Sequence, residues 1–250
     1  VEPERRLDFK RWSDDVLLAI TLPGTRAELM RLRESILAFH AYLEAAVERR
    51  RREPRQDLIS ALIEASEAEG GFLSTPDIIA FTRLLLVAGN ETTTNLIGNM
   101  MALLADRPEL WRRAREDRSL VEPIIEEVLR YESPVQRFPR VTTRPVKIGD
   151  VEIGAGEIVD IVYGAANRDP SVFEDPDSFR PERPTNQQHL GFGLGTHFCL
   201  GAPLARLEAR ITLNAFLDRF PALGRGEGAA VRQGFAPVSL GYKSLPLVLG

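Results

Sequence analysis

Cysteine is nearly absent from this sequence, whose 250 residues contain only Cys199. A single cysteine excludes a disulfide within the chain and suits a reducing compartment, so we expect a cytoplasmic protein. Long hydrophobic runs are also missing, which predicts that no segment spans a membrane. An excess of positive charge is missing as well, since the net charge is −4 at pH 7. We therefore expect neither a nucleic acid nor a membrane as a partner.

The first 132 residues carry apolar side chains at helical spacing, as at Leu29, Leu32 and Ile36. A long helix is predicted over residues 75–106. Ser74 or Thr75 serves as its N-cap, and Pro76 lies in its first turn. The sequence Asp-Arg-Pro that follows residue 105 ends this helix. This part of the chain is therefore expected to be helical throughout.

From residue 133 onward the pattern changes. Residues 140–162 alternate apolar and polar side chains around a Gly149-Asp150 turn, which predicts short antiparallel strands. Residues 202–220 return to helical spacing, and residues 238–250 are expected to form a final strand pair. The predicted fold class is α+β, mainly α, with a small antiparallel sheet.

Residues 191–201 read GFGLGTHFCLG and place four glycines around the single cysteine. Glycines allow a tight loop and a close approach of backbone to a flat cofactor, and a thiolate near a helix N-terminus suits an iron ligand. On the residues alone, a buried structural cysteine in a glycine-rich turn is the alternative. A zinc site from His189, His197 and Cys199 is a third interpretation, although the paired spacing and a fourth ligand are missing.

Residues 87–95 read VAGNETTTN and lie within the predicted long helix. Gly89 is unfavourable there by about 1 kcal/mol relative to alanine. One interpretation is close helix packing at Gly89, with threonine hydroxyls bonded to helix carbonyls. The other is that Gly89 leaves room for a bound molecule to which Glu91 and Thr92 relay protons. The residues alone leave both interpretations open.

The stretch FGLGTHFCLG resembles the haem-binding loop of the cytochrome P450 family, the haem-thiolate monooxygenases, whose pattern is Phe-Gly-x-Gly-x-His-x-Cys-x-Gly. The resemblance implies that Cys199 is the thiolate ligand of haem b iron. It also implies that Phe192 packs beneath the haem, that Gly193 and Gly201 shape the loop, and that His197 donates a hydrogen bond to a haem propionate.

The stretch VAGNETTTN is similar to the oxygen-activating helix of the same family, with its pattern Ala/Gly-Gly-x-Asp/Glu-Thr-Thr/Ser. This similarity assigns Thr92 to bound dioxygen and Glu91 to proton delivery. It also places Gly89 and Thr93 among the catalytic residues and Ala88 next to the cofactor.

Two further stretches resemble structural parts of the family. EEVLRYESPV resembles its Glu-x-x-Arg helix, in which Glu127 and Arg130 would join an arginine from a later loop. DPDSFRPERP resembles that loop and makes Arg183 the first candidate and Arg180 the second. The stretch FPRVTTRPV resembles the family segment that carries a propionate-binding arginine, here Arg140.

The resemblance extends over nearly the whole chain and implies a haem-thiolate monooxygenase. Such an enzyme oxidises an apolar small molecule with dioxygen and two electrons, which come indirectly from NAD(P)H through a ferredoxin and a ferredoxin reductase. The candidates for the substrate pocket are Leu85, Val135, Phe138 and Pro139. The alternative is a haem-binding relative without turnover, whereas an all-helical interaction module would not explain Cys199 and its glycines.

The start of the chain departs from the family pattern, because a long N-terminal portion precedes the region that residues 3–17 resemble. We expect one domain over residues 1–250 that is incomplete at its N-terminal side, with a helical part (1–132) and a part with strands and the haem-binding loop (133–250). Helix 75–106 is apolar on several faces, so we also expect a complementing N-terminal segment or a second copy to cover it.

Overall fold

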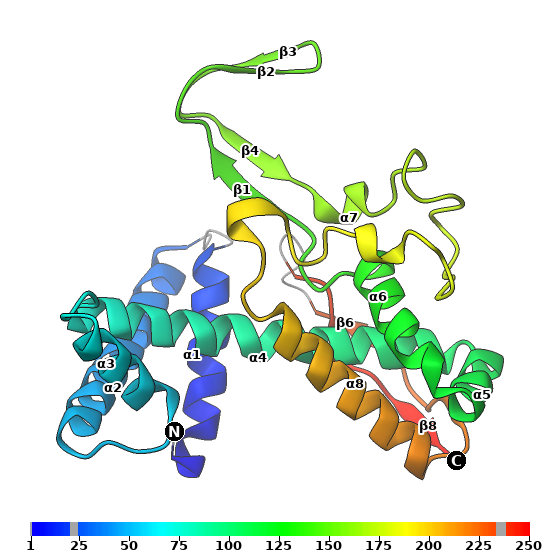
Figure 1. The fold of residues 1–250 in the computed structure, drawn as a ribbon, viewed down its shortest axis with the longest axis horizontal. Helices are drawn as coiled ribbons and strands as arrows, with labels where there is room; N and C mark the ends of the chain where they lie inside the picture. The colour runs from blue at the N-terminus through cyan, green and yellow to red at the C-terminus, as the bar shows by residue number, and fades with distance from the viewer. Residues whose placement is uncertain (1, 21–24, 234–238) are drawn as a thin grey trace. The chain divides into compact units, whose positions relative to one another are not determined.

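The structure, a computed structural model, describes residues 2–20, 25–233 and 239–250 (Figure 1). It forms two compact units, Val1–Glu91 and Thr92–Gly250, and the boundary between them lies inside helix α4 (Thr75–Ala105). Further helices are α1 (Arg6–Ile20), α2 (Arg26–Arg52), α3 (Leu58–Ala68), α5 (Pro108–Glu116), α6 (Val121–Tyr131), α7 (Tyr163–Ala166) and α8 (Ala202–Arg219). The expectation of one domain over the whole chain stays a prediction.

The first unit contains α1, α2, α3 and the first part of α4. Thr25 caps α2, because its hydroxyl accepts the Glu28 N–H at 3.2 Å while the Glu28 carboxylate accepts the Thr25 N–H at 2.9 Å. Apolar and aromatic side chains of the four helices pack into one core around Trp12 and Phe39, whose rings stack at 5.1 Å.

Helix α4 begins and ends close to where the sequence predicts. The Ser74 hydroxyl accepts the Asp77 N–H at 3.3 Å, and the Asp77 carboxylate accepts the Ser74 N–H at 2.9 Å. Ser74, and not Thr75, is therefore the N-cap. The helix ends at Ala105, next to Asp106, whose carboxylate binds the Arg225 guanidinium at 2.6 Å.

The second unit packs the later part of α4 against α5, α6 and α8. The core is formed by large apolar side chains that these helices bury, among them Met100, Trp111, Ile124, Leu129 and Leu213. Burying a side chain of this size stabilises the fold by about 1.5–3 kcal/mol. None of the helices in the described ranges is both long and apolar enough to cross a membrane.

The strands are short and antiparallel: β1 (Phe138–Val141), β2 (Val146–Ile148), β3 (Val151–Ile153), β4 (Ile158–Ile161), β5 (Leu223–Arg225), β6 (Val231–Arg232), β7 (Tyr242–Ser244) and β8 (Leu247–Leu249). They pair as β1–β4, β2–β3, β5–β8 and β6–β7. Gly149 has a φ of 57° in the β2–β3 turn, as the Gly149-Asp150 pattern predicts. The predicted α+β fold class is confirmed, with separate strand pairs in the described residues where one small sheet was expected.

The predicted strand pair at the end of the chain is wrong. Both strands form, but β7 pairs with β6 and β8 with β5. Only Leu245 and Pro246 separate them, and the first residue of a two-residue hairpin loop must adopt a positive φ, which leucine disfavours. Val238, with which the predicted pair began, lies outside the described residues.

Candidate active site

The Cys199 loop (residues 191–201) leads through a 3₁₀ turn, Gly195–His197, to the start of α8. Gly193 and Gly195 both have a φ of 70°, a conformation that side chains other than glycine rarely adopt. The Cys199 N–H donates to the Phe192 carbonyl at 2.9 Å, which closes the loop on itself. The glycines are therefore needed for this backbone path.

Cys199 is exposed in the structure, which does not support the alternative of a buried structural cysteine. Apolar side chains surround it in sequence and are exposed as well: Leu194 (78%), Phe198 (51%) and Leu200 (74%). His197 and Gly201 are also exposed. A surface thiol within an exposed apolar loop fits haem, which would cover this apolar surface and take the sulfur as its ligand.

A zinc site does not form here. In the ranges that the structure describes, no group of three His, Cys, Asp or Glu side chains could hold a metal ion. His189 is buried, and its Nε2 lies 3.1 Å from a carboxylate oxygen of Glu126. The interpretation that combined His189, His197 and Cys199 therefore has no support in the geometry.

The middle of α4 presents an open surface at Gly89. A Cβ atom at this position would meet no described atom within 4 Å, and Ala88 is exposed beside it. The interpretation of Gly89 as a close-packing residue therefore does not hold for the described residues. Thr93 is buried, whereas Thr92 and Glu91 are half-buried and adjacent on the helix.

A buried cluster of one carboxylate and two guanidinium groups, here called the triad cluster, consists of Glu127, Arg130 and Arg183. Arg130 donates two hydrogen bonds of 2.8 Å to Glu127, one from Nε to Oε2 and one from Nη2 to Oε1. Arg183 Nε lies 3.6 Å from Glu127 Oε1. The second candidate, Arg180, has an exposed side chain but donates its backbone N–H to Glu127 at 2.7 Å.

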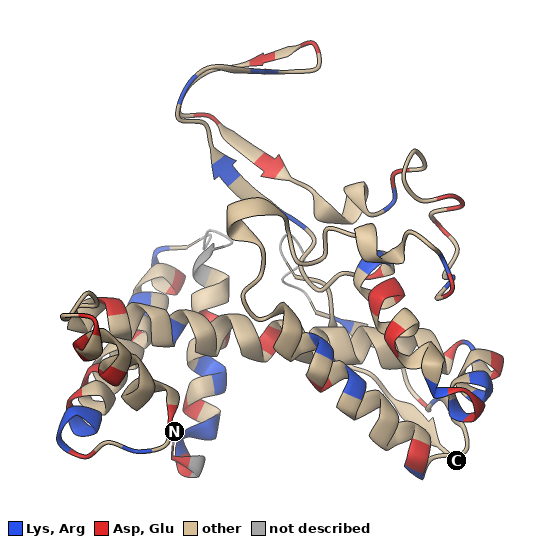
Figure 2. Cartoon of the chain, viewed as in Figure 1, with Lys and Arg blue, Asp and Glu red and all other residues tan. Residues whose placement is uncertain are grey.

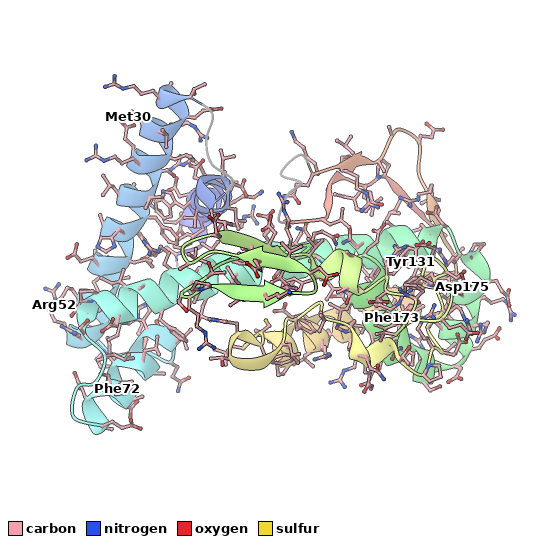
Figure 3. The ribbon with its side chains drawn as sticks, turned by 90° about the horizontal axis from the view of Figure 1, so that it is seen from above. Met30, Arg52, Phe72, Tyr131, Phe173 and Asp175 are labelled. Carbon is pink, nitrogen blue, oxygen red and sulfur yellow. The ribbon has the colours of Figure 1, made fainter. Side chains whose placement is uncertain are left out.

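Arg130 also fixes the loop that follows α7. Its Nη1 donates to the carbonyls of Asn167 at 3.0 Å and Pro176 at 2.9 Å, and its guanidinium carbon lies 5.4 Å from the Phe173 ring centroid. Figure 3 labels Phe173 and Tyr131 in this part of the unit. A buried arginine with all these acceptors joins α6 to the loop.

The other predicted residues lie on or next to β1 and on α4. Arg140 is half-buried on β1 and donates to the Pro139 carbonyl at 2.9 Å. Among the pocket candidates, Phe138 and Pro139 are exposed on β1, Val135 is half-buried beside it, and Leu85 is half-buried on α4. No hydrogen bond in the described ranges joins Arg140 or His197 to Cys199.

The sequence analysis missed a second charged group, here called the loop cluster, which consists of Glu126, His189 and Arg206. Arg206 donates to both carboxylate oxygens of Glu126, at 2.7 and 2.9 Å. Burial raises the pKa of Glu126, but the hydrogen bonds from Arg206 and His189 outweigh it and lower the pKa from 4.5 to about 2. Glu126 precedes the motif glutamate Glu127, and nothing in the sequence distinguished it from a solvated neighbour.

Two asparagines on α4 were also missed. Asn95 Nδ2 donates to the Ser239 hydroxyl at 2.8 Å, and Asn99 Nδ2 donates to the carbonyls of Glu132 and Leu240 at 3.0 and 3.1 Å. Gly241 packs so closely here that a Cβ atom would overlap the Asn95 side chain. Asn95 and Asn99 are four residues apart and therefore lie on one face of α4, which is the signal in the sequence that could have grouped them.

Comparison with known proteins places these features in a family. The family model described as cytochrome P450 matches residues 15–223. Cytochrome P450 107B1 of Saccharopolyspora erythraea is 44% identical over 99% of this chain and 59% of its own length. The structure of CYP109Q5 from Chondromyces apiculatus has a TM-score of 0.86 and 46% identity, and the match covers 100% of this chain and 61% of that one.

A second solved structure, CYP109E1 from Bacillus megaterium in complex with corticosterone, has a TM-score of 0.85 and 37% identity over 100% of this chain and 66% of its own. The chain thus spans about three fifths of the length of the relatives it matches. Because the family model matches most of the chain, the chain belongs to the cytochrome P450 family, whose members hold haem b by a cysteine thiolate and use electrons derived from NAD(P)H.

Proposed function

We propose that this chain is part of a cytochrome P450 monooxygenase that binds haem b through Cys199 and oxidises an apolar small molecule with dioxygen. The observation that carries the proposal is the exposed Cys199, held just before α8 by a loop in which two of the four glycines have positive φ. The CYP109E1 structure was solved with a steroid, which supports an apolar substrate for a related chain. Leu85, Val135, Phe138 and Pro139 are the residues that we propose to contact it.

The chain's own residues have separate tasks in this proposal. When bound, the haem supplies the two-electron activation of dioxygen, and a thiolate ligand favours cleavage of the O–O bond. Cys199 would provide that ligand, and Phe192 would pack against the haem within a loop that Gly193 and Gly201 shape. His197 and Arg140 would donate N–H groups to the propionates, which would add charge-assisted hydrogen bonds to the affinity.

Proton delivery is assigned to α4. Gly89 and Ala88 have no bulky side chain, so dioxygen and cofactor can approach the helix there. The Thr92 hydroxyl would donate a hydrogen bond to dioxygen, the Glu91 carboxylate would exchange protons with solvent, and Thr93 is their buried neighbour on the helix.

The decisive test of the proposed function is Cys199→Ser. The reduced, carbon monoxide-bound protein should show the red-shifted absorbance band of a thiolate-ligated ferrous haem, and the variant should lose that band. An unchanged band in the variant would show that another group holds the iron.

A second test concerns the protons. Thr92→Ala should retain haem but form less product per NAD(P)H oxidised, because reduced oxygen escapes as peroxide when the hydroxyl is missing. Thr94→Ala, two residues later on the same helix, is the matched control. Equal coupling in both variants would remove Thr92 from the proposal. Glu91→Gln should slow oxygen activation and alter the solvent isotope effect.

The partners follow from the family. We propose that a ferredoxin and its reductase deliver the electrons. We also propose that a complementing N-terminal segment or a second copy of the chain covers helix α4, which is apolar on several faces and on which Leu84 is 60% exposed. Light scattering with intact-mass analysis tests this. A compact, haem-loaded and active monomer of 27.9 kDa would contradict it.

A further inference from the structure

The loop cluster lies beside the Cys199 loop, and the proposed function assigns it no task. The two ring nitrogens of its histidine have different hydrogen-bond partners. His189 Nδ1 accepts the Gly191 N–H at 3.0 Å, so this nitrogen carries no proton. The proton must be on Nε2, which then donates to Glu126 Oε2 at 3.1 Å. Glu126 thus accepts from His189 and from Arg206 at the same time.

Two contacts connect this cluster to the Cys199 loop. The first is the hydrogen bond from Gly191, the residue at which the loop begins. The second is the Arg206 guanidinium, whose carbon lies 4.7 Å from the Phe192 ring centroid, within the range of a cation–π interaction. Because the Phe192 carbonyl accepts the Cys199 N–H at 2.9 Å, a shift of Phe192 would also move Cys199.

The first contact leaves little room for adjustment. A Cβ atom at Gly191 would lie 2.8 Å from the Leu129 carbonyl oxygen of α6. The loop therefore starts pressed against α6, and Glu126 on the same helix holds the histidine two residues earlier. Helix α6 thus contacts the loop at its first residue, Gly191, and Arg206 of α8 contacts the ring of the next residue, Phe192.

Arg206 is the member of the cluster that can be replaced without overpacking. Its side chain is 38% exposed and borders a pocket of about 480 Å³ between α6 and α8. The same pocket is lined by a second ion pair, Glu122–Arg210, one turn away on both helices, with 3.2 Å between nitrogen and oxygen. Figure 2 shows acidic residues along α6 and basic residues along α8. The two pairs differ in burial, since the Glu126 side chain is 9% exposed and the Glu122 side chain 72%, and only the pair of Arg206 reaches the Cys199 loop.

We propose that Glu126, His189 and Arg206 are positioning residues that hold residues 191–199 in the conformation that presents the Cys199 sulfur to the haem iron. The proposal rests on the proposed function, since it takes Cys199 as the ligand. It goes further by assigning the stability of that ligation to three side chains that do not touch the sulfur.

The experiment compares Arg206→Gln with Arg210→Gln in the haem-loaded protein at its natural length. In the reduced, carbon monoxide-bound state, we expect the thiolate band of Arg206→Gln to convert about tenfold faster to the shorter-wavelength band of a neutral thiol ligand, the factor that corresponds to loss of one ordinary charged contact. Arg210→Gln should behave like the unchanged protein. Arg206→Lys keeps the charge without the two parallel bonds and should lie between them.

A second measurement does not depend on haem. Hydrogen exchange of the Cys199 amide should be faster in Arg206→Gln than in Arg210→Gln, while amides in the middle of α8 exchange equally in both. Faster exchange throughout α8 would indicate general destabilisation and would overturn the proposal. Equal exchange at Cys199 in the two variants would overturn it as well.

The histidine supplies an independent arm if Arg206→Gln does not fold. His189→Gln retains an N–H donor for Glu126, whereas His189→Leu removes both hydrogen bonds. We expect faster conversion in His189→Leu than in His189→Gln, and equal rates in His189→Leu and the unchanged protein would contradict the role. Cys199→Ser separates the two proposals. If it loses the thiolate band while Arg206→Gln matches Arg210→Gln, only the positioning proposal fails.

Discussion

Two parts of the second unit, the triad cluster and the Cys199 loop, differ in how far their side chains are buried. Every member of the triad cluster is at most 4% exposed, and Arg130 is saturated with acceptors. The Cys199 loop exposes its sulfur and three large apolar side chains. The polypeptide buries the triad cluster, although Arg183 Nε has no hydrogen-bond partner in the described residues, whereas it leaves the Cys199 loop exposed.

This difference separates scaffold from binding surface. A buried charge cluster stabilises only when every partner is present, because desolvated charges without a partner are costly. An apolar loop can keep its backbone conformation through its glycines and a few hydrogen bonds, even where its side chains are exposed. Substitutions in the two regions should therefore have effects of different size and kind.

The largest effect is expected from Glu127→Ala. It leaves the Arg130 and Arg183 guanidinium groups buried without their carboxylate, which costs about 3–5 kcal/mol of unfolding free energy. Little or no haem-loaded protein should then be recovered. Urea unfolding measures the loss. Glu122 lies on the same helix as Glu127, and Glu122→Ala breaks an exposed pair with Arg210 of α8, so it should cost less than about 1 kcal/mol. Equal losses would contradict the assignment of a large cost to the burial of the triad cluster.

The next effect concerns removal of haem. A ligand at 100 times its dissociation constant stabilises the state that binds it by about 2.7 kcal/mol, so the haem-free protein should melt at a lower temperature. Haem should also suppress binding of a fluorescent apolar dye, because it covers Leu194, Phe198 and Leu200. Identical melting and dye binding with and without haem would show that this surface is covered by something else.

A smaller effect is expected from pH through Glu126. Its pKa is lowered in the folded protein to about 2, so its stabilisation is complete above the unfolded value of 4.5 and is lost as the pH falls from there toward 2. We expect the unchanged protein to lose on the order of 2 kcal/mol more than Glu126→Gln over that range, since the partly exposed Arg206 is screened. Unfolding at successive pH values measures it, and parallel curves would refute the assignment.

The smallest effect is expected within the Cys199 loop itself. Gly195→Ala forces a side chain into a φ of 70° but meets no described atom within 4 Å, so the strain alone should cost about 1 kcal/mol. Gly224→Ala is the matched control, because position 224 is equally open and has no positive φ. Thermal unfolding of the two haem-free variants compares them, and a cost at Gly224 as large as at Gly195 would exclude backbone strain as the cause.

The sequence predicts the local elements well because their causes are local. Ser74 and Asp77 cap α4 from three residues apart, and Gly149 makes its turn by its own φ. The positive φ at Gly193 and Gly195 in the Cys199 loop is likewise a property of residues within the loop. In these places, interactions between residues close in the sequence determine the structure, so they can be recognised in one sequence.

The long-range contacts could not be predicted in the same way. Glu126 meets His189 and Arg206, which are 63 and 80 residues away, and neither spacing carries a periodic signal. Glu126 and Glu127 are identical residues that a turn of about 100° on α6 directs to different partners. The predicted pairing of β7 with β8 was wrong for the same reason. Their actual partners, β6 and β5, lie earlier in the chain, and the residues between β7 and β8 give no indication of them.

The packing of Gly241 against Asn95 limits how this sequence can vary. As long as position 95 holds asparagine, any side chain at position 241 would overlap it. The overlap includes the Cβ atom of Asn95, which no change of rotamer can move away. Only glycine at position 95 would remove the whole overlap, and it would also release Ser239. The two positions must therefore change together or not at all, and random mutagenesis that varies them singly should recover almost no tolerated substitution at position 241.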